Sequence, residues 1–267
     1  MSPRPRLRRA GVRPSDLVRR LIYPVPVWLP RREESIAALA ASTTTDNGTV
    51  VLHHRAPEGA ATVTYLHGNG SDLSTIGTIA QLLRDSGLGF AAFEYPGYGP
   101  HAGEPRQAAI LAAARDGLAH LRGAGVSLRR TVLVGESLGS SVAAHLAAEG
   151  QLRSEDETGR LVLISPFTNM AAMVRRYTRL DPRGLVSEPW ATDVTVRSIT
   201  EPTLVIHGAK DTLVPPAMSR RLAAELPRAT RIVVPDRKHD NLWEPPSECL
   251  AAVVDFARST DTEATEA

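Results

Sequence analysis

The sequence contains a single cysteine, Cys249, and very little lysine, because only Lys210 and Lys238 among its 31 basic residues are lysine. One cysteine excludes internal disulfides and offers no cysteine cluster for a metal. Cys249 lies in a helix-like pattern and is expected to be a small core residue. The preference for arginine is a compositional bias that indicates no function by itself.

The sequence also lacks a long apolar run. No stretch approaches the roughly 20 apolar residues that a membrane-spanning helix needs. Residues 17–29 form the most apolar N-terminal stretch, but two arginines and two prolines interrupt it, and no small-residue cleavage site follows. These features do not match a signal peptide, so the expected location is the cytoplasm.

Charge is distributed unevenly along the 267 residues. Residues 1–32 carry nine arginines and one acid, Asp16, a local charge of +8 that leaves −6 for the rest of a chain whose net charge is +2. The body therefore shows no sign of a nucleic-acid surface. Weak peripheral contact with an anionic membrane is a hypothesis for this basic arm, and packing against the body is the alternative.

The body alternates between short β-branched strands and helices of about a dozen residues, the pattern of a mostly parallel sheet covered on both faces. An antiparallel edge pair, with a turn signal at 46–48, is expected before it. The expected strands are 36–41, 49–55, 62–66, 89–93, 131–134, 161–164, 203–206 and 230–234. The expected helices are 73–86, 106–122, 137–149, 217–225 and 247–258.

One segment breaks this rhythm. Residues 166–202 contain four prolines and a helical pattern at 170–177. They are either a cap over the carboxyl ends of the strands, where ligands bind in parallel sheets, or a plain connection. The predicted organisation is an arm (1–32), one α/β domain (33–258) with this insertion, and a disordered acidic tail (259–267).

The insertion also carries a group of arginines. They could favour substrates bearing phosphate or carboxylate, or they could form a solvated helix face. The group comprises Arg175, Arg176, Arg179 and Arg183.

Residues 131–141 carry the strongest chemical signal. A β-branched run leads into Gly-Glu-Ser-Leu-Gly at 135–139, and an alanine-rich helical pattern follows. A turn this sharp needs glycine two residues before and two residues after Ser137, whose hydroxyl it lifts clear of the sheet. The pentapeptide alone is a weak signal that an ordinary Gly/Ser turn would also give. The rest of the chain must therefore decide between such a turn and a nucleophile elbow.

A serine nucleophile needs a base, and the base needs an orienting carboxylate. Asp211 follows the strand predicted at 203–206, and His239 follows the strand predicted at 230–234. The order Ser137, Asp211, His239 is the one that a nucleophile elbow requires. Asp211 alone could merely cap the next helix, and Asp236 and Asp240 are fallback carboxylates.

An oxyanion needs two converging backbone N–H groups. The expected donors are Leu138, next to the nucleophile, and Asn69, in the glycine-rich turn at 67–70. His67 is expected to be structural. Residues 94–99 either shape the pocket wall or form a plain Pro-Gly turn.

Together these motifs resemble the α/β hydrolase superfamily, and within it the small serine hydrolases related to acyl-protein thioesterases and monoacylglycerol lipases. The resemblance spans about 49–258 and implies an eight-stranded, mostly parallel sheet with Ser137 as nucleophile, His239 as base and Asp211 as orienting acid. Two positions depart from the family pattern: Ser140 stands where a glycine is common, and Glu94 where an aspartate is usual. Neither touches the three catalytic candidates.

The predicted activity is cleavage of carboxylic ester or thioester substrates through an acyl-enzyme on Ser137, with no metal or organic cofactor. Acyl transfer to another acceptor or peptidase activity could use the same residues. A non-catalytic ligand-binding protein is a further alternative. The sequence indicates neither the residues that bind substrate nor the oligomeric state.

Overall fold

The computed structural model describes residues 22–23, 40–99, 101–179, 181 and 186–259. Most of the predicted arm, residues 36–39 and almost all of the predicted tail lie outside these residues. Within the described part of the chain, no helix is both long and apolar enough to cross a membrane.

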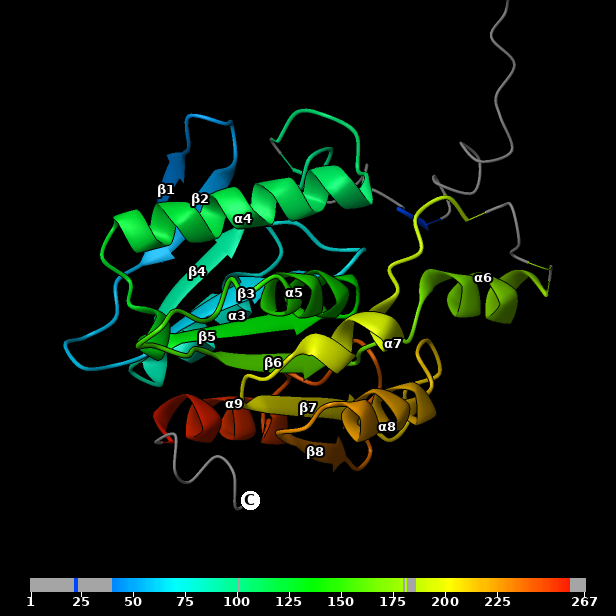
Figure 1. The fold of residues 1–267 in the computed structure, drawn as a ribbon. Helices are drawn as coiled ribbons and strands as arrows, with labels where there is room; N and C mark the ends of the chain where they lie inside the picture. Colours follow the sequence, from blue (N-terminus) through cyan, green and yellow to red (C-terminus); the bar gives the residue numbers. More distant parts are fainter. Residues whose placement is uncertain (1–21, 24–39, 100, 180, 182–185, 260–267) are drawn as a thin grey trace, which may run out of the picture.

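The described residues form an eight-stranded sheet in the order β1-β2-β4-β3-β5-β6-β7-β8 (Figure 1). β2 pairs antiparallel with both β1 and β4, and all the other pairs are parallel. The predicted mostly parallel sheet is thus confirmed. The strands are β1 (Ala41–Thr44), β2 (Val50–His54), β3 (Thr62–Leu66), β4 (Gly89–Phe93), β5 (Thr131–Glu136), β6 (Arg160–Ile164), β7 (Thr203–Gly208) and β8 (Ala229–Val234).

Helices cover both faces of the sheet. The core on one face contains buried residues of α4, α5 and α8, which lie in front of the sheet in Figure 1, and the core on the other face contains those of α3 and α9. The helices are α3 (Gly77–Asp85), α4 (Gln107–Gly123), α5 (Leu138–Ala148), α6 (Met170–Thr178), α7 (Thr192–Thr195), α8 (Pro216–Glu225) and α9 (Glu248–Arg258), with 3₁₀ turns η1 (Leu128–Arg130) and η2 (Val196–Ser198).

The strand sequences account for the two cores. Side chains alternate across a strand, so Val132 and Val134 of β5 enter one core while Leu133 enters the other. Every residue of β3, β4, β6 and β7 is buried. Apolar residues therefore predominate in these strands, since both of their faces are covered. Cys249 of α9 is fully buried in one of these cores, as predicted.

Two elements differ from their predicted bounds by more than two residues. β1 begins at Ala41, where the strand predicted at 36–41 ends, because the tight turn at 45–49 brings the pairing with β2 right up to Thr44. Helix α3 begins four residues later than predicted. The carboxylate of Asp72 accepts hydrogen bonds from the N–H (2.9 Å) and hydroxyl (2.6 Å) of Ser74, which folds this stretch into a turn.

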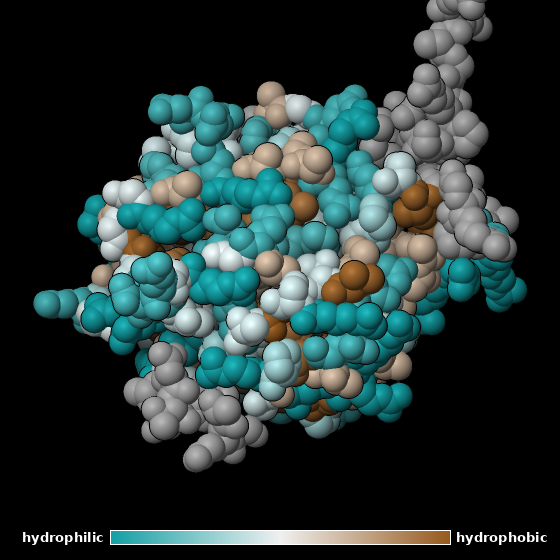
Figure 2. Space-filling model, viewed as in Figure 1, coloured by the Kyte–Doolittle hydropathy of each residue, from teal (hydrophilic) through white to brown (hydrophobic). Residues whose placement is uncertain are grey.

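The segment 166–202 contains α6, α7 and η2, and α6 lies beyond the carboxyl ends of β5 and β6 (Figure 1). Asn169 caps α6 by accepting a hydrogen bond from the N–H of Ala172 at 2.8 Å. The face of the molecule drawn in Figure 2 is mostly hydrophilic, with small, separate apolar spots. That face therefore shows no large apolar docking surface.

Candidate active site

Ser137 stands at a strained turn between β5 and α5. Its backbone angles are φ 53° and ψ −113°, a conformation that is rare for a residue with a side chain. A Cβ atom on Gly135 would lie 2.1 Å from the carbonyl oxygen of Gly139, and one on Gly139 would lie 2.0 Å from that of Leu66. Only glycine fits at these two positions, so the turn can hold the Ser137 side chain at the end of the sheet.

Asp211 and His239 follow the carboxyl ends of β7 and β8, which are parallel neighbours. The Oδ2 atom of Asp211 lies 2.8 Å from Nδ1 of His239. The Oδ1 atom accepts the N–H groups of Leu213 (2.9 Å) and Val214 (2.8 Å). Asp211 therefore folds its own loop with one oxygen and contacts a histidine with the other. It does not cap the next helix, α8, whose N-cap residue Pro215 makes no side-chain capping hydrogen bond.

His207 is a second partner of Asp211, and the sequence motifs predict no role for it. Its Nε2 atom lies 3.1 Å from Oδ2 of Asp211 and 2.9 Å from the carbonyl oxygen of Val214. Both partners are acceptors, so Nε2 carries the proton and donates. The only sequence signal was a histidine at the end of a buried strand, four residues before Asp211.

These contacts determine the charge state of Asp211. Its side chain is fully buried, which alone would raise the pKa of the carboxyl group. Hydrogen bonds from His207 and His239, the charge of His239 and the N–H of Val214 outweigh that effect, and they lower the pKa well below its ordinary value. Asp211 is thus an anion that orients His239.

The loop that carries His239 packs directly on the loop that carries Asp211. The N–H of Lys210 donates to the carbonyl of Arg237 at 2.8 Å, and a Cβ on Gly208 would lie only 2.4 Å from that oxygen. The fallback carboxylate Asp236 instead pairs with Lys210 at 2.5 Å on the surface. The geometry thus favours Asp211 as the carboxylate that orients the histidine.

The two predicted oxyanion donors lie beside Ser137. A Cβ on Gly68 would be 3.4 Å from Cβ of Ser137, so the glycine-rich turn at 67–70 runs right next to the serine. Within the described residues, the backbone N–H groups of Asn69 and Leu138 have no acceptor.

A buried histidine–glutamate contact fixes the base of this turn. Nε2 of His67 lies 3.0 Å from Oε1 of Glu94, and both side chains are fully buried. Glu94 also accepts the N–H groups of Leu73 (3.0 Å) and Tyr95 (3.1 Å). His67 is thus structural, and the glutamate that departs from the family pattern links the turns that follow β3 and β4.

A cavity of about 520 Å³ opens beside the serine. Both Ser137 and His239 line it, together with the glycine-rich turn and one face of α3. Glu136 is also in the wall, where its Oε2 atom accepts hydrogen bonds from Tyr65 (2.5 Å) and Trp243 (2.8 Å). No sequence motif predicts the contact among these three wall residues, because only the fold brings them together.

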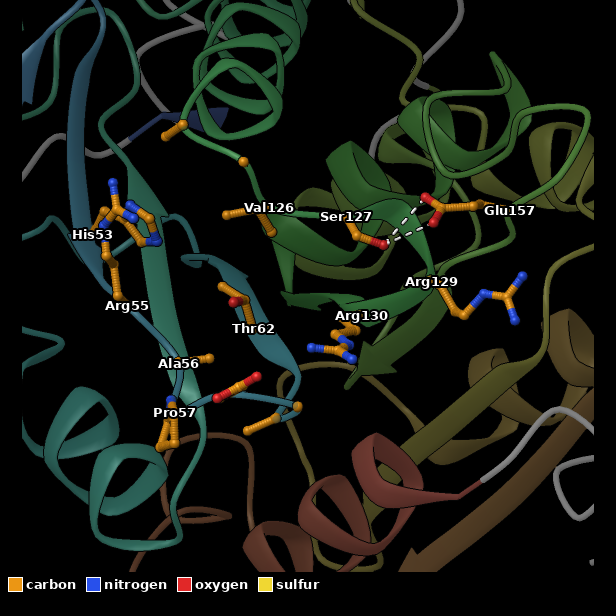
Figure 3. A pocket seen from close by; sticks show the side chains of 15 residues that line it. His53, Arg55, Ala56, Pro57, Thr62, Val126, Ser127, Arg129, Arg130 and Glu157 are labelled. Carbon is orange, nitrogen blue, oxygen red and sulfur yellow. Dashed lines mark hydrogen bonds between the residues drawn. The ribbon is translucent and has the colours of Figure 1, made fainter.

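Another cavity, of about 400 Å³, contains none of these catalytic candidates (Figure 3). Its lining comes from the end of β2, the start of β3 and the segment that leads into β5. In the close-up, Ser127 donates to both carboxylate oxygens of Glu157 (3.0 and 3.1 Å), and the side chain of Arg129 points away from the centre. The catalytic candidates Ser137, Asp211 and His239 instead follow the carboxyl ends of their strands, at the edge of the sheet opposite to this second cavity.

Comparison with known proteins agrees with the fold. The family model described as serine aminopeptidase, S33, matches residues 57–192, which is half of the chain, and the model described as alpha/beta hydrolase fold matches residues 185–246. The chain belongs to the α/β hydrolase superfamily. The superfamily that the sequence motifs resemble is thus confirmed.

Named relatives of this α/β hydrolase differ in their descriptions. An uncharacterized protein of Mycobacterium tuberculosis is 33% identical over 191 residues, which cover 70% of this chain and 66% of that protein. The lysophosphatidylserine lipase ABHD12 of Macaca fascicularis is 28% identical over 180 residues, 61% of this chain and 44% of the lipase. The chain thus matches less than two thirds of the length of either relative.

Solved structures share the fold. The Pyrococcus furiosus esterase Pf2001 superposes with a TM-score of 0.64 at 21% identity, covering 87% of this chain and 95% of the esterase. A bacterial membrane phospholipase A gives a TM-score of 0.62 at 19% identity, covering 86% and 90%. At these identities the likeness concerns the fold alone.

Proposed function

We propose that this α/β hydrolase cleaves carboxylic ester or thioester bonds through an acyl-enzyme on Ser137. One observation carries the proposal: Ser137, in its strained turn, and His239, held by Asp211 at 2.8 Å, line the same cavity. A serine, a base and an orienting carboxylate that follow three strands of one sheet form the arrangement required for nucleophilic acyl transfer.

The proposed reaction uses groups of this chain and water. Because Nδ1 of His239 is bound to Asp211, Nε2 is left to accept the Ser137 proton as Oγ forms a bond to the substrate carbonyl carbon. The N–H groups of Asn69 and Leu138 hold the resulting oxyanion. The alcohol or thiol leaves with the proton from His239. Water, deprotonated by His239, then attacks the acyl-enzyme. The bond from the acyl carbon to Oγ of Ser137 breaks, Oγ takes the proton back from His239, and the acid is released.

Peptidase activity is the second candidate, because the family model that covers half of the chain is described as serine aminopeptidase. Amide cleavage would use the same residues and would differ in the leaving group that His239 protonates. Transfer of the acyl group to an alcohol or amine is a third outcome. The narrower resemblance to acyl-protein thioesterases and monoacylglycerol lipases stays a prediction.

A chain-length series of p-nitrophenyl esters, with matched thioesters and p-nitroanilides, tests the proposal. The wild type should release p-nitrophenol with an initial burst, and Ser137→Ala should lose turnover by about a thousandfold or more. Ser198→Ala is a matched control, because Ser198 is exposed on η2 and its hydroxyl bonds only its own turn. Amide cleavage without ester cleavage, or an active Ser137→Ala variant, would contradict the proposal.

A further inference from the structure

The side chain of Asn69 is held at both ends. Its Oδ1 atom accepts a hydrogen bond from the hydroxyl of Tyr98 at 2.5 Å, and its Nδ2 group donates to the backbone carbonyl of Ile22. An amide anchored through both its oxygen and its nitrogen cannot rotate freely. The two anchors therefore fix the peptide whose N–H group is proposed to face the oxyanion.

Ile22 and Tyr23 come from far upstream of the sheet, yet both are buried, with exposed fractions of 7% and 3%. The hydroxyl of Tyr23 donates to the carboxylate of Glu188 and accepts from Nε1 of Trp190 at 2.7 Å. Burial and the contact with Glu188 raise the pKa of Tyr23, so this hydroxyl keeps its proton and remains a donor. The dipeptide thus lies between the glycine-rich turn and residues 188–190.

Residues 188–190 are themselves fixed to α4. The carboxylate of Glu188 accepts the N–H of Gln107 at 3.1 Å, and the N–H of Trp190 donates to the side-chain oxygen of Gln107 at 3.1 Å. Trp190 is fully buried with φ 39°, a backbone conformation that persists only when the surroundings impose it. The anchor of Tyr23 is therefore rigid.

We propose that Ile22–Tyr23 is a strap that positions the oxyanion turn, with Tyr23 and Tyr98 as positioning residues that act through Asn69. This role rests on the hydrolase function proposed above. Neither tyrosine needs to touch the substrate. Each restricts Asn69, and in this way the strap connects the segment 166–202 to the reaction centre. A change in the packing of Glu188 or Trp190 would reach the oxyanion donor through Tyr23.

The test measures Tyr23→Phe and Tyr98→Phe, which remove one hydroxyl each and keep the ring. For each variant, kcat and KM for p-nitrophenyl butyrate are determined, together with Ki for a trifluoromethyl ketone, which adds to serine and forms an oxyanion. We expect kcat to fall and Ki to rise by about tenfold, with KM within about twofold, because the loss concerns the oxyanion. The double variant Tyr98→Phe/Asn69→Ala should lose no more than Asn69→Ala alone.

Ser141→Ala is the matched control for stability. It removes a buried hydroxyl contact, 2.7 Å to Thr192, without touching Asn69. It should lower the melting temperature about as much as the tyrosine variants do and leave kcat unchanged. If the wild type is active and the tyrosine variants have lower melting temperatures but unchanged kcat and Ki, the strap proposal alone is overturned. A wild type that neither turns over esters nor binds the ketone would overturn the proposed function and the strap together.

Discussion

Asp211 and His239 are joined by a 2.8 Å contact between Oδ2 and Nδ1, although they belong to different loops and are 28 positions apart in the sequence. Because the pKa of Asp211 is strongly lowered, the partner of His239 is an anion, and it would stabilise the imidazolium that the proposed acyl transfer forms. The proposed role of this contact can be tested directly.

Asp211→Asn should reduce kcat for ester hydrolysis by about a thousandfold or more, because an amide cannot stabilise the imidazolium and can select the wrong tautomer. Steady-state and single-turnover kinetics measure the loss. Asp236→Asn is the matched control, since Asp236 is exposed, pairs only with Lys210 and has a positive φ that asparagine tolerates. Equal activity of the two variants would mean that Asp211 serves only to fold its loop.

The lowered pKa of Asp211 also predicts how stability depends on pH. An aspartate titrates near pH 3.9 in the unfolded chain, where it lacks the hydrogen bonds of the folded loop. In the folded protein, the pKa of Asp211 lies lower. The charged form is thus favoured by folding, so its contribution is complete above about pH 5 and is lost as pH falls through the folded pKa. In urea unfolding, the stability advantage of the wild type over Asp211→Asn should shrink below about pH 4. An advantage that grows there would contradict this account.

The turn at Ser137 should tolerate no side chain at Gly135. A methyl group there would lie 2.1 Å from the backbone oxygen of Gly139, so Gly135→Ala should cost about 3 kcal/mol of unfolding free energy and most of the activity. Gly123→Ala is the control. It adds the same methyl group in open space at the end of α4, where alanine favours the helix. Denaturant unfolding measures the unfolding free energy of both variants. A stable, active Gly135→Ala variant would contradict the claim that the turn at Ser137 excludes a side chain at position 135.

The cavity beside Ser137 carries negative rather than positive charge. Among the described residues, its lining includes Glu136, Asp240 and Glu244 but no lysine or arginine. Arg176 of the insertion donates instead to the carbonyl of Thr212 at 2.9 Å. Arg175 and Arg179 do not line the cavity, and Arg183 lies outside the described residues. We therefore predict, contrary to the hypothesis that these arginines favour anionic substrates, that anionic esters are the poorer ones.

p-Nitrophenyl hemisuccinate should show roughly fivefold lower kcat/KM than p-nitrophenyl butyrate at low salt, with the gap narrowing at high salt and in Glu136→Gln. Glu58→Gln, at the other cavity, should leave the ratio unchanged. A preference for the anionic ester would contradict this prediction and support the hypothesis that the arginines of the insertion favour anionic substrates.

Much of the fold could be predicted because the strands have clear local sequence patterns. Buried β-branched runs followed by Gly, Pro or Asp place the ends of β5, β7 and β8 within a few residues, and parallel pairing brings Ser137, Asp211 and His239 to one edge of the sheet. The order of these three residues along the chain can also be read directly from the sequence. The sequence was therefore sufficient to nominate these residues.

The supporting contacts could not be predicted, because they join segments with no local relationship. Tyr23 meets Trp190 across 167 positions, and Trp243 meets Glu136 across 107. Nothing in the residues around Tyr23 signals these partners. The start of α3 was misplaced for a different reason: the Asp72 side chain forms a turn that competes with a helical pattern.

The central claim is that Ser137 is an activated nucleophile, and labelling with a fluorophosphonate probe tests it most directly. Wild type, Ser137→Ala and Ser198→Ala would be incubated with the probe, checked for folding by circular dichroism, and analysed by intact mass and peptide mapping. The account predicts a single adduct, on Ser137, in the wild type and in Ser198→Ala, and no adduct in Ser137→Ala. A folded wild type that stays unlabelled, or a Ser137→Ala variant labelled at the same rate, would contradict it.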